Sequence, residues 1–188
     1  MEERRICPWQ RGDLLAASIR GALHSPKKIL RPYVTEGMTA IDVGCGMGYF
    51  SLPMAAYVGE SGTVIATDLQ PEMLDGLNRR TAQSGITNVA AHHCKKDTLD
   101  LGAWAEKIDF ALVFWMLHEV PDSRRLIGEL HAALSGSGKL LFVEPKGHVN
   151  ALQFDKCLDM MMTIGFKVIG SPKVAFSRAS LLTKTIKK

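Results

Sequence analysis

Short apolar stretches alternate with amphipathic stretches along most of the 188-residue chain. Where a stretch is brief, rich in apolar and β-branched residues, and bounded by turn residues, its pattern predicts a β-strand. Strands are expected at residues 39–43, 63–67, 89–94, 109–114 and 139–143. Helices are expected at residues 49–57, 71–84, 98–106, 122–134 and 150–164. This alternation predicts an α/β fold with helices on both faces of the sheet.

Both ends of the chain carry further predicted elements. Near the N-terminus one helix begins at about Asp13, and another follows Ser25, which is a suitable N-cap. At the C-terminus, residues 165–170 and 173–183 are expected to form two last strands joined by a short Ser-Pro turn. The sequence SGSG at residues 135–138 predicts the end of the helix before it.

The composition is typical of a globular protein, and we expect residues 1–188 to form a single domain. The longest apolar run has eight residues, Phe110 to Leu117, whereas a membrane-spanning helix needs roughly 20. The N-terminus shows no secretory signal. The four cysteines form no CxxC pair, which favours reduced thiols in a cytoplasmic protein. A net charge of +4 at pH 7 allows a nucleic-acid partner without indicating one.

A glycine-rich loop follows the first predicted strand. It reads Asp42-Val43-Gly44-Cys45-Gly46-Met47-Gly48. Glycines at alternate positions let the backbone turn tightly and approach a ligand closely. The loop leads into a helix N-terminus at the carboxyl end of a strand, where open α/β sheets bind ligands. The dinucleotide-binding pattern GxGxxG fails, because Tyr49 stands where the last glycine would be.

Two carboxylates flank this loop in sequence. Asp42 would repel a pyrophosphate but suits an ammonium group. Asp68 ends the second strand and can accept hydrogen bonds from ribose hydroxyls, with Leu69 and Met73 placed to flank an adenine. The alternative for Asp68 is an N-cap of the helix that Pro71 opens. Together the carboxylates favour S-adenosylmethionine, which carries an amino group, a sulfonium and a single carboxylate.

Asp97 follows the third predicted strand and has two interpretations. Its carboxylate can accept a hydrogen bond from an adenine amino group, or it can cap the helix expected at 98–106. The neighbouring sequence His92-His93-Cys94 contains metal-binding residue types. Adjacent strand residues point to opposite faces, so we expect no metal site there.

Five segments together resemble the class I S-adenosylmethionine-dependent methyltransferases. They read AIDVGCGMGYFS, VIATDLQPEML, KDTLDL, KIDFALVFWMLHEV and LSGSGKLLFVEP. The likeness is greatest to the small-molecule branch that includes quinone-biosynthesis methyltransferases, and it covers roughly residues 27–145. It implies a Rossmann-like three-layer sandwich whose seven-stranded, mostly parallel sheet has the order 3-2-1-4-5-7-6, with strand 7 antiparallel. It also implies S-adenosylmethionine as the cofactor and S-adenosylhomocysteine as the product.

The resemblance gives a set of candidate cofactor-binding residues. With those found from the loop and strand ends, the set is Asp42, Gly44, Cys45, Gly46, Gly48, Asp68, Leu69, Met73, Asp97, Thr98 and Phe114. The chain departs from the family pattern after the fourth strand, where residues 116–119 read MLHE in place of a proline pair or a His-His pair. Gly136 stands where many members have proline. The first departure leaves the substrate open.

Methyl transfer from a sulfonium is a direct displacement, so the protein mainly positions the reactants. A general base is needed only when the acceptor must lose a proton. His118 is the candidate catalytic residue, and its alternative is a histidine packed beneath the turn. Glu119 is expected to cap the helix after Pro121. Glu144, at the end of the fifth strand, is a further candidate for contact with the cofactor or substrate.

The sequence therefore predicts a methyltransferase that acts on a small-molecule acceptor. The alternatives are a protein that binds the cofactor without transferring its methyl group, and a methyltransferase for RNA or protein. A nicotinamide-dependent oxidoreductase is disfavoured by Tyr49 and Asp42. We expect the helical segment 1–36, which includes Trp9 and Arg11, to be able to cover the cofactor site. The run of methionines at 160–162 is expected to fill the core.

Overall fold

The structure is a computed structural model that describes residues 23–185. The helix expected from Asp13, together with Trp9 and Arg11, lies outside the described residues. The seven strands form one sheet in the order β3-β2-β1-β4-β5-β7-β6, which confirms the order that the resemblance implies. The chain divides into two compact units between Cys94 and Lys95, and each unit is described separately. Whether the chain acts as a single domain stays a prediction.

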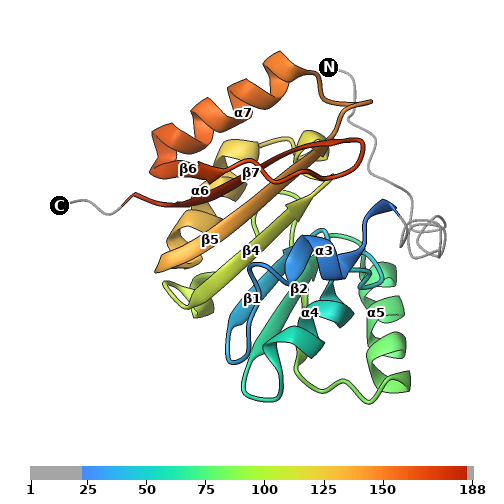
Figure 1. The fold of residues 1–188 in the computed structure, drawn as a ribbon. Helices are drawn as coiled ribbons and strands as arrows, with labels where there is room; N and C mark the ends of the chain where they lie inside the picture. The colour runs from blue at the N-terminus through green and yellow to red at the C-terminus, as the bar shows by residue number, and fades with distance from the viewer. Residues whose placement is uncertain (1–22, 186–188) are drawn as a thin grey trace. The chain divides into compact units, whose positions relative to one another are not determined.

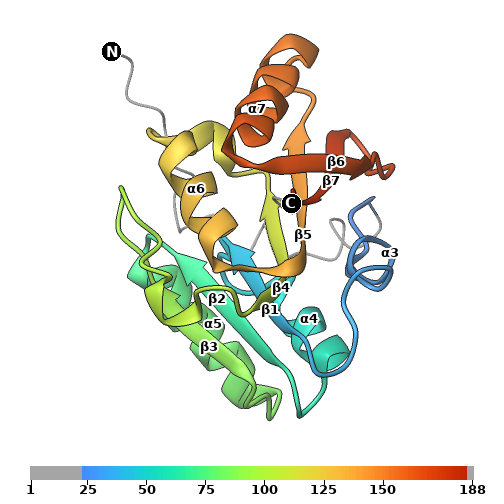
Figure 2. The same ribbon diagram turned by 90° about the vertical axis from the view of Figure 1, so that its left-hand side faces the viewer.

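The first unit consists of three parallel strands and their connecting helices (Figure 1). In chain order the elements are α3 (Pro26–Leu30), β1 (Thr39–Val43), α4 (Ser51–Val58), β2 (Thr63–Asp68), α5 (Pro71–Gln83) and β3 (Val89–His93). The helices α4 and α5 lie on the same face of the strands (Figures 1 and 2). The connections from β1 to β2 and from β2 to β3 both run in the same direction along the sheet. Because such connections are right-handed, their helices lie on one face.

The second unit combines parallel and antiparallel pairing. Its elements are the 3-10 helix η2 (Gly102–Trp104), β4 (Ile108–Phe114), the 3-10 helix η3 (Leu117–Glu119), α6 (Ser123–Ala133), β5 (Leu134–Pro145), α7 (Ala151–Ile164), β6 (Phe166–Gly170) and β7 (Ser177–Lys184). Strand β5 pairs in parallel with β4 and antiparallel with β7, and β7 pairs antiparallel with β6. Helix α7 contacts α6 and β6, and it lies over β6 in Figure 1.

Burial follows the position of each strand in the sheet. From Ala40 to Val43, β1 is buried, and β4 is buried except for Asp109, which is partly so. Apolar residues on both faces of these strands are covered, as expected for parallel strands in the interior of a sheet. The outer strands β3 and β6 are largely exposed. This explains why the pattern of β3 is the least apolar of the strands predicted in the first unit.

The prediction of a helix at residues 98–106 is wrong. Among the described residues only the 3-10 helix Gly102–Trp104 occurs there. The backbone N–H groups of Leu99 and Asp100 donate to the Glu129 carboxylate, 2.7 and 3.2 Å away, and Asp100 has a φ of 53°. These contacts hold the segment in a conformation that an α-helix excludes.

The sequence SGSG at 135–138 forms no separate turn, because it lies inside strand β5. Helix α6 does end before it, at Ala133. The pairing of β4 with β5 shifts from Ile108 opposite Leu134 to Phe110 opposite Lys139. A Cβ at Gly138 would lie 2.8 Å from the Ile108 carbonyl oxygen, so glycine permits the close approach. The last strand is also shorter at its start than predicted, beginning at Ser177.

Candidate functional site

The glycine-rich loop turns back onto β2 directly after β1. Gly44 and Cys45 both donate their backbone N–H groups to the Thr67 carbonyl oxygen at 2.9 Å. The φ angles of Gly44, Gly46 and Gly48 are 70°, 54° and 84°, all in the region that side chains with a Cβ rarely adopt. The loop conformation expected from the glycine spacing is therefore present.

Gly48 is also required for packing. A Cβ at this position would lie 2.4 Å from Cδ1 of Leu77 and 2.5 Å from Cδ1 of Leu52. The loop thus lies directly against α4 and α5. Met73 of α5 is buried, with its sulfur 3.9 Å from where a Gly46 Cβ would be. This close packing leaves Gly44 as the exposed part of the loop.

Asp68 connects the loop to the turn between β2 and α5. Its Oδ2 accepts the Gly46 N–H at 2.9 Å, and its Oδ1 accepts the Gln70 N–H at 2.9 Å. A carboxylate has about four acceptor sites, more than the backbone N–H groups of Gln70, Gly46 and Leu69 occupy, so Asp68 retains capacity for a ligand hydroxyl. Gln70, and not Asp68, is the N-cap residue of α5. Asp68 is therefore not the N-cap of α5, and its contact with a ribose stays a prediction.

Burial raises the pKa of the Asp68 carboxyl, while hydrogen bonds from the Gln70, Gly46 and Leu69 backbone lower it, as does nearby His93. Desolvation is the largest of these effects. The His93 ring lies at the end of β3, with Nε2 3.0 Å from the Leu69 carbonyl oxygen. His93 is thus a neighbour of the candidate ribose site, although its sequence context indicated only a strand end.

Asp42 is a buried carboxylate at the end of β1, with 3% of its surface exposed. The Ser51 hydroxyl, at the start of α4, donates to its Oδ2 at 2.6 Å. Burial raises the pKa of the neighbouring Cys45 thiol well above its usual value, and Asp42 and Asp68 raise it further. The thiol is therefore neutral and packs as a small apolar group. Two carboxylates thus lie beside a neutral thiol, and the Arg80 guanidinium donates to the Met47 carbonyl oxygen of the same loop at 2.6 Å.

This arrangement fits S-adenosylmethionine better than a dinucleotide. The exposed glycine allows a ligand close to the backbone, and Asp68 can accept hydroxyl groups. The carboxylates of Asp42 and Asp68 favour the amino and sulfonium groups of that ligand and would repel a pyrophosphate. The fit rests on backbone and side-chain positions within the first unit alone.

The second unit holds the other candidate cofactor residues. Asp97 is exposed and forms an ion pair with Arg125 of α6 at 3.6 Å. The Thr98 hydroxyl donates to Glu129 at 3.0 Å. Because no α-helix begins after Asp97, its interpretation as a helix cap is wrong. Contact of Asp97 and Thr98 with an adenine stays a prediction.

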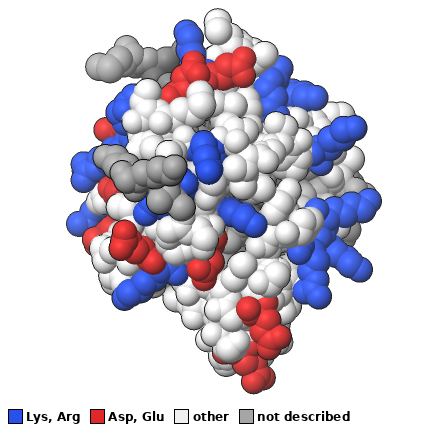
Figure 3. Space-filling model, turned by 60° about the vertical axis from the view of Figure 1, so that its left-hand side comes forward, with Lys and Arg blue, Asp and Glu red and all other residues white. Residues whose placement is uncertain are grey.

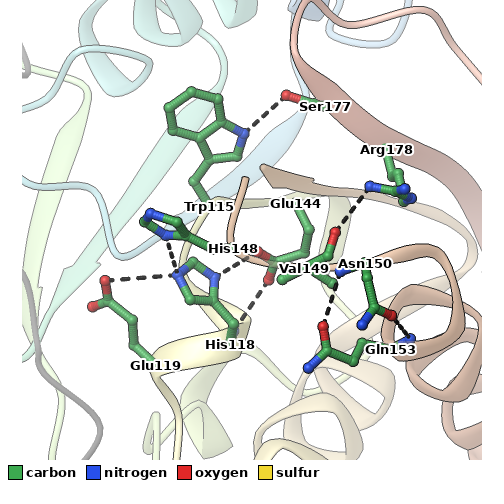
Figure 4. Close-up of polar contacts among 10 residues, drawn as sticks. All are labelled: Trp115, His118, Glu119, Glu144, His148, Val149, Asn150, Gln153, Ser177 and Arg178. Atoms are coloured by element: carbon green, nitrogen blue, oxygen red, sulfur yellow. Dashed lines mark hydrogen bonds and ion pairs between the residues drawn. The ribbon is translucent and has the colours of Figure 1, made fainter. Parts of the chain in front are cut away.

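Strand β4 ends in an aromatic pair. Phe114 is buried and stacks on Trp115, with ring centroids 5.4 Å apart. Trp115 has a φ of 59°, an uncommon conformation for a bulky residue that often accompanies a functional site. Its indole N–H donates to the Ser177 hydroxyl at 2.9 Å (Figure 4), which fixes the ring at the end of the strand.

His118 lies in η3, directly after this aromatic pair, and is held by Glu144 (Figure 4). The His118 backbone N–H donates to Glu144 Oε1 at 3.1 Å, and its ring Nδ1 lies 2.6 Å from Oε2. Glu144 is 1% exposed and sits near the end of β5. These two contacts with one buried carboxylate hold His118 in place, and its catalytic role stays a prediction.

Two more side chains reach the other edge of the His118 ring. His148 Nδ1 lies 3.4 Å from His118 Nε2, and Glu119 Oε1 lies 3.9 Å from it (Figure 4). The expectation that Glu119 caps the following helix is wrong, because the N-cap of α6 is Asp122. Sequence reasoning missed His148, whose only signal is its place in the turn after the fifth strand.

No group of three or more metal-binding side chains converges among the residues that the structure describes. Within the same residues, no helix is long and apolar enough to span a membrane. The face drawn in Figure 3 carries acidic side chains as well as basic ones, so it gives no specific support for a nucleic-acid partner.

Comparison with known proteins gives consistent results. A family model described as a methyltransferase domain matches residues 34–173. A demethylmenaquinone methyltransferase of Oceanobacillus iheyensis is 26% identical over 114 residues, which are 61% of this chain and 47% of that protein. The chain thus spans about half the length of the curated relatives it matches.

Solved structures show the same fold. A SAM-dependent methyltransferase from Aquifex aeolicus aligns with a TM-score of 0.85 at 22% identity, over 96% of this chain and 100% of that one. The cyclase SpnF aligns with a TM-score of 0.69 at 14% identity, over 95% of this chain and 82% of that one. At these identities the likeness concerns the fold alone.

Proposed function

Because the chain belongs to the methyltransferase domain family, we propose that it transfers a methyl group from S-adenosylmethionine to a small-molecule acceptor. The product is S-adenosylhomocysteine. The observation that carries this proposal is the Asp68 carboxylate, which the Gly46 and Gln70 N–H groups hold beside the glycine-rich loop. The donor supplies an activated methyl group, and its departing sulfur becomes a neutral thioether.

The residues of the chain have distinct tasks in this proposal. Asp68 accepts the ribose hydroxyls, and the loop gives the donor close access to the backbone. Asp42, whose Oδ2 accepts the Ser51 hydroxyl, supplies negative charge for the amino group. The full proposed cofactor set is Asp42, Gly44, Cys45, Gly46, Gly48, Asp68, Leu69, Met73, Asp97, Thr98 and Phe114.

His118 belongs to the acid–base part of the proposal. It is needed only for acceptors that lose a proton, because displacement at a sulfonium otherwise requires positioning alone. A small acceptor is supported by the similarity to a demethylmenaquinone methyltransferase. That this chain also acts on a small acceptor is part of the proposal. The absence of a nucleic-acid partner and the cytoplasmic location that the cysteines favour are proposed as well.

A second candidate function is favoured by one observation. The cyclase SpnF shares the fold, so this architecture can serve chemistry other than methyl transfer. A protein that binds S-adenosylmethionine without using its methyl group would have the same glycine-rich loop and Asp68. Binding of the donor alone therefore cannot distinguish the two functions.

Calorimetry with S-adenosylmethionine, S-adenosylhomocysteine and NADH tests the donor. We expect the first two to bind and NADH to show no binding at the same concentrations. Transfer of a labelled methyl group to a panel of phenols, thiols, amines and carboxylic acids then tests the activity. Binding of NADH alone would refute the proposal, and donor binding without transfer to any acceptor would favour the second candidate.

A further inference from the structure

Glu144, His118 and His148 form a continuous chain of polar groups within the second unit (Figure 4). The carboxylate end is buried, with Glu144 only 1% exposed. The opposite end is open, because His148 is exposed. The His118 side chain between them is 23% exposed. A buried charge joined to the surface through two imidazoles is an arrangement that can move a proton.

The Glu144 contacts determine which His118 nitrogen carries the proton. An ionised carboxylate only accepts hydrogen bonds, and Oε2 lies 2.6 Å from Nδ1. We therefore assign the proton of neutral His118 to Nδ1, which makes Nε2 the acceptor. The His148 Nδ1 lies 3.4 Å from that Nε2. With its own proton on Nδ1, His148 donates toward His118 and presents Nε2 as an acceptor.

The position of His148 is fixed by its backbone surroundings. The Val149 N–H donates to the Pro145 carbonyl oxygen at 2.9 Å, and Arg178 of β7 donates to the Val149 carbonyl oxygen at 2.9 Å. Asn150 then begins α7 with reciprocal side-chain and backbone hydrogen bonds to Gln153. The turn that carries His148 is thus held from β5, β7 and α7, which is the support an acid–base residue needs.

We infer that Glu144, His118 and His148 are a proton relay, and that the acceptor is a compound with a weakly acidic hydroxyl group, such as a phenol or an enol. This inference rests on the proposed methyl transfer and names its substrate class. His148 is the catalytic residue that meets the hydroxyl, whereas His118 and Glu144 act through it and position it.

The transfer balances in atoms and charge. The hydroxyl O–H bond breaks, and its electron pair forms the new bond to the methyl carbon. The sulfonium C–S bond breaks and its electron pair stays on sulfur. The hydroxyl proton passes to His148 Nε2 while His148 Nδ1–H passes its proton to His118 Nε2. The resulting His118 cation lies against the Glu144 carboxylate, and the proton afterwards returns through His148 to water.

Other charged groups lie around the relay. Glu119 of η3 faces His118 Nε2 at 3.9 Å and favours the cation. Glu144 of β5 also favours the His118 cation, from the Nδ1 side of the ring. Lys146, in the same turn as His148, is exposed, and Arg178 of β7 is engaged with a backbone carbonyl. The carboxylates nearest to His118 therefore both support protonation of the relay.

Two acceptors that differ only in ionisation test the relay. Phenol keeps its proton at pH 8, since a phenolic pKa is about 10, whereas 4-nitrophenol is ionised there. With labelled donor we expect His148→Asn and His118→Asn to slow transfer to phenol by about 100-fold or more. Transfer to 4-nitrophenol should fall less than about 3-fold, because its proton is already gone. Equal losses with both acceptors would overturn the relay.

Two controls accompany this test. His92→Asn, a histidine of β3 in the first unit, should leave both rates unchanged. Glu144→Gln should lower the phenol rate and spare the nitrophenol rate, as His118→Asn does. If the wild-type protein binds S-adenosylmethionine and methylates thiols or amines but neither phenol, the inferred substrate class is wrong while the proposed function survives. Absence of donor binding would instead refute the proposed function.

Nuclear magnetic resonance of protein with labelled histidine rings tests the relay without any substrate. We expect neutral His118 to carry its proton on Nδ1 in the wild type and to lose this preference in Glu144→Gln. A His118 proton on Nε2, or an unchanged preference for Nδ1 in Glu144→Gln, would contradict the relay whatever the activity.

Discussion

At the scale of single residues, Asp68 is a buried carboxylate whose hydrogen bonds favour its ionised form. It is 8% exposed, and burial raises its pKa. Backbone N–H groups of Gln70, Gly46 and Leu69 stabilise the ionised form. The cost of keeping this carboxylate in the cofactor-free protein is consistent with a role in ligand binding, because functional sites often retain groups that destabilise the fold.

Asp68→Ala should weaken binding of S-adenosylmethionine by about 1.5–3 kcal/mol, the usual effect of losing hydrogen bonds to a charged group. Calorimetric titration of the folded variant measures this loss. Asp75→Ala, on the exposed side of the same α5 helix, is the matched control and should bind as the wild type does. Unchanged affinity in Asp68→Ala would mean that the ribose is held elsewhere.

Asp68 should also make the stability of the cofactor-free protein depend on pH. Its pKa in the folded state is raised above the ordinary 3.8, so the folded protein binds more protons than the unfolded chain. The stabilising contribution is complete below 3.8 and is lost as pH rises through the raised pKa. Asp68→Asn should remove this decline. Urea unfolding from about pH 4 to 7 measures it, and parallel curves for both proteins would contradict it.

At the scale of elements, side-chain caps begin both α6 and α7 of the second unit. Helix α7 begins with a capping box, in which Asn150 and Gln153 exchange side-chain and backbone hydrogen bonds at 2.9 Å. The cap also fixes the turn that carries His148. Helix α6 begins with a cap from Asp122 but contains Gly128 in its interior, which weakens it relative to alanine.

These two helices give predictions of opposite sign. Asn150→Ala should lower the free energy of unfolding by about 1 kcal/mol, because the first turn of α7 loses its acceptor. Gly128→Ala should raise it by about 0.5–1 kcal/mol, since a Cβ there meets no atom within 4 Å. Chemical denaturation with a constant slope measures both changes. Stabilisation by Asn150→Ala would show that the cap does not hold the helix.

At the scale of the whole molecule, the glycine-rich loop and the relay belong to separate units of the chain. The glycine-rich loop and Asp68 lie before the boundary at Cys94, and His118, Glu144 and His148 lie after it. The family match spans both, from residue 34 to residue 173. Asp97, Thr98 and Phe114 of the proposed cofactor set also lie after the boundary.

Hydrogen exchange of the full chain should reflect this division. S-adenosylmethionine should slow exchange at residues 44–48 and 68–73, where the loop and the turn after β2 meet the donor. Strands β6 and β7 should exchange at an unchanged rate, because none of their residues belongs to the proposed cofactor set. Excess NADH serves as the negative control. Protection confined to β6 and β7 would place the donor in the wrong part of the chain.

The sequence by itself determined the features that depend on neighbouring residues. The spacing of apolar residues predicted β1, β2 and β4 closely, because each is a short buried strand next to a clear turn. The glycines at 44, 46 and 48 predicted a tight loop, since few other residues adopt its φ angles. The acidic strand ends and the resemblance to known methyltransferases then indicated the donor.

Only the tertiary structure decided the contacts between distant residues. Glu144 reaches His118 from 26 positions away, and His148 from 30, because strand pairing brings the ends of β4 and β5 together. Glu129 similarly holds Leu99 and prevents the expected helix. Such contacts depend on the register of strands and the direction of side chains, which the local pattern of the chain does not specify.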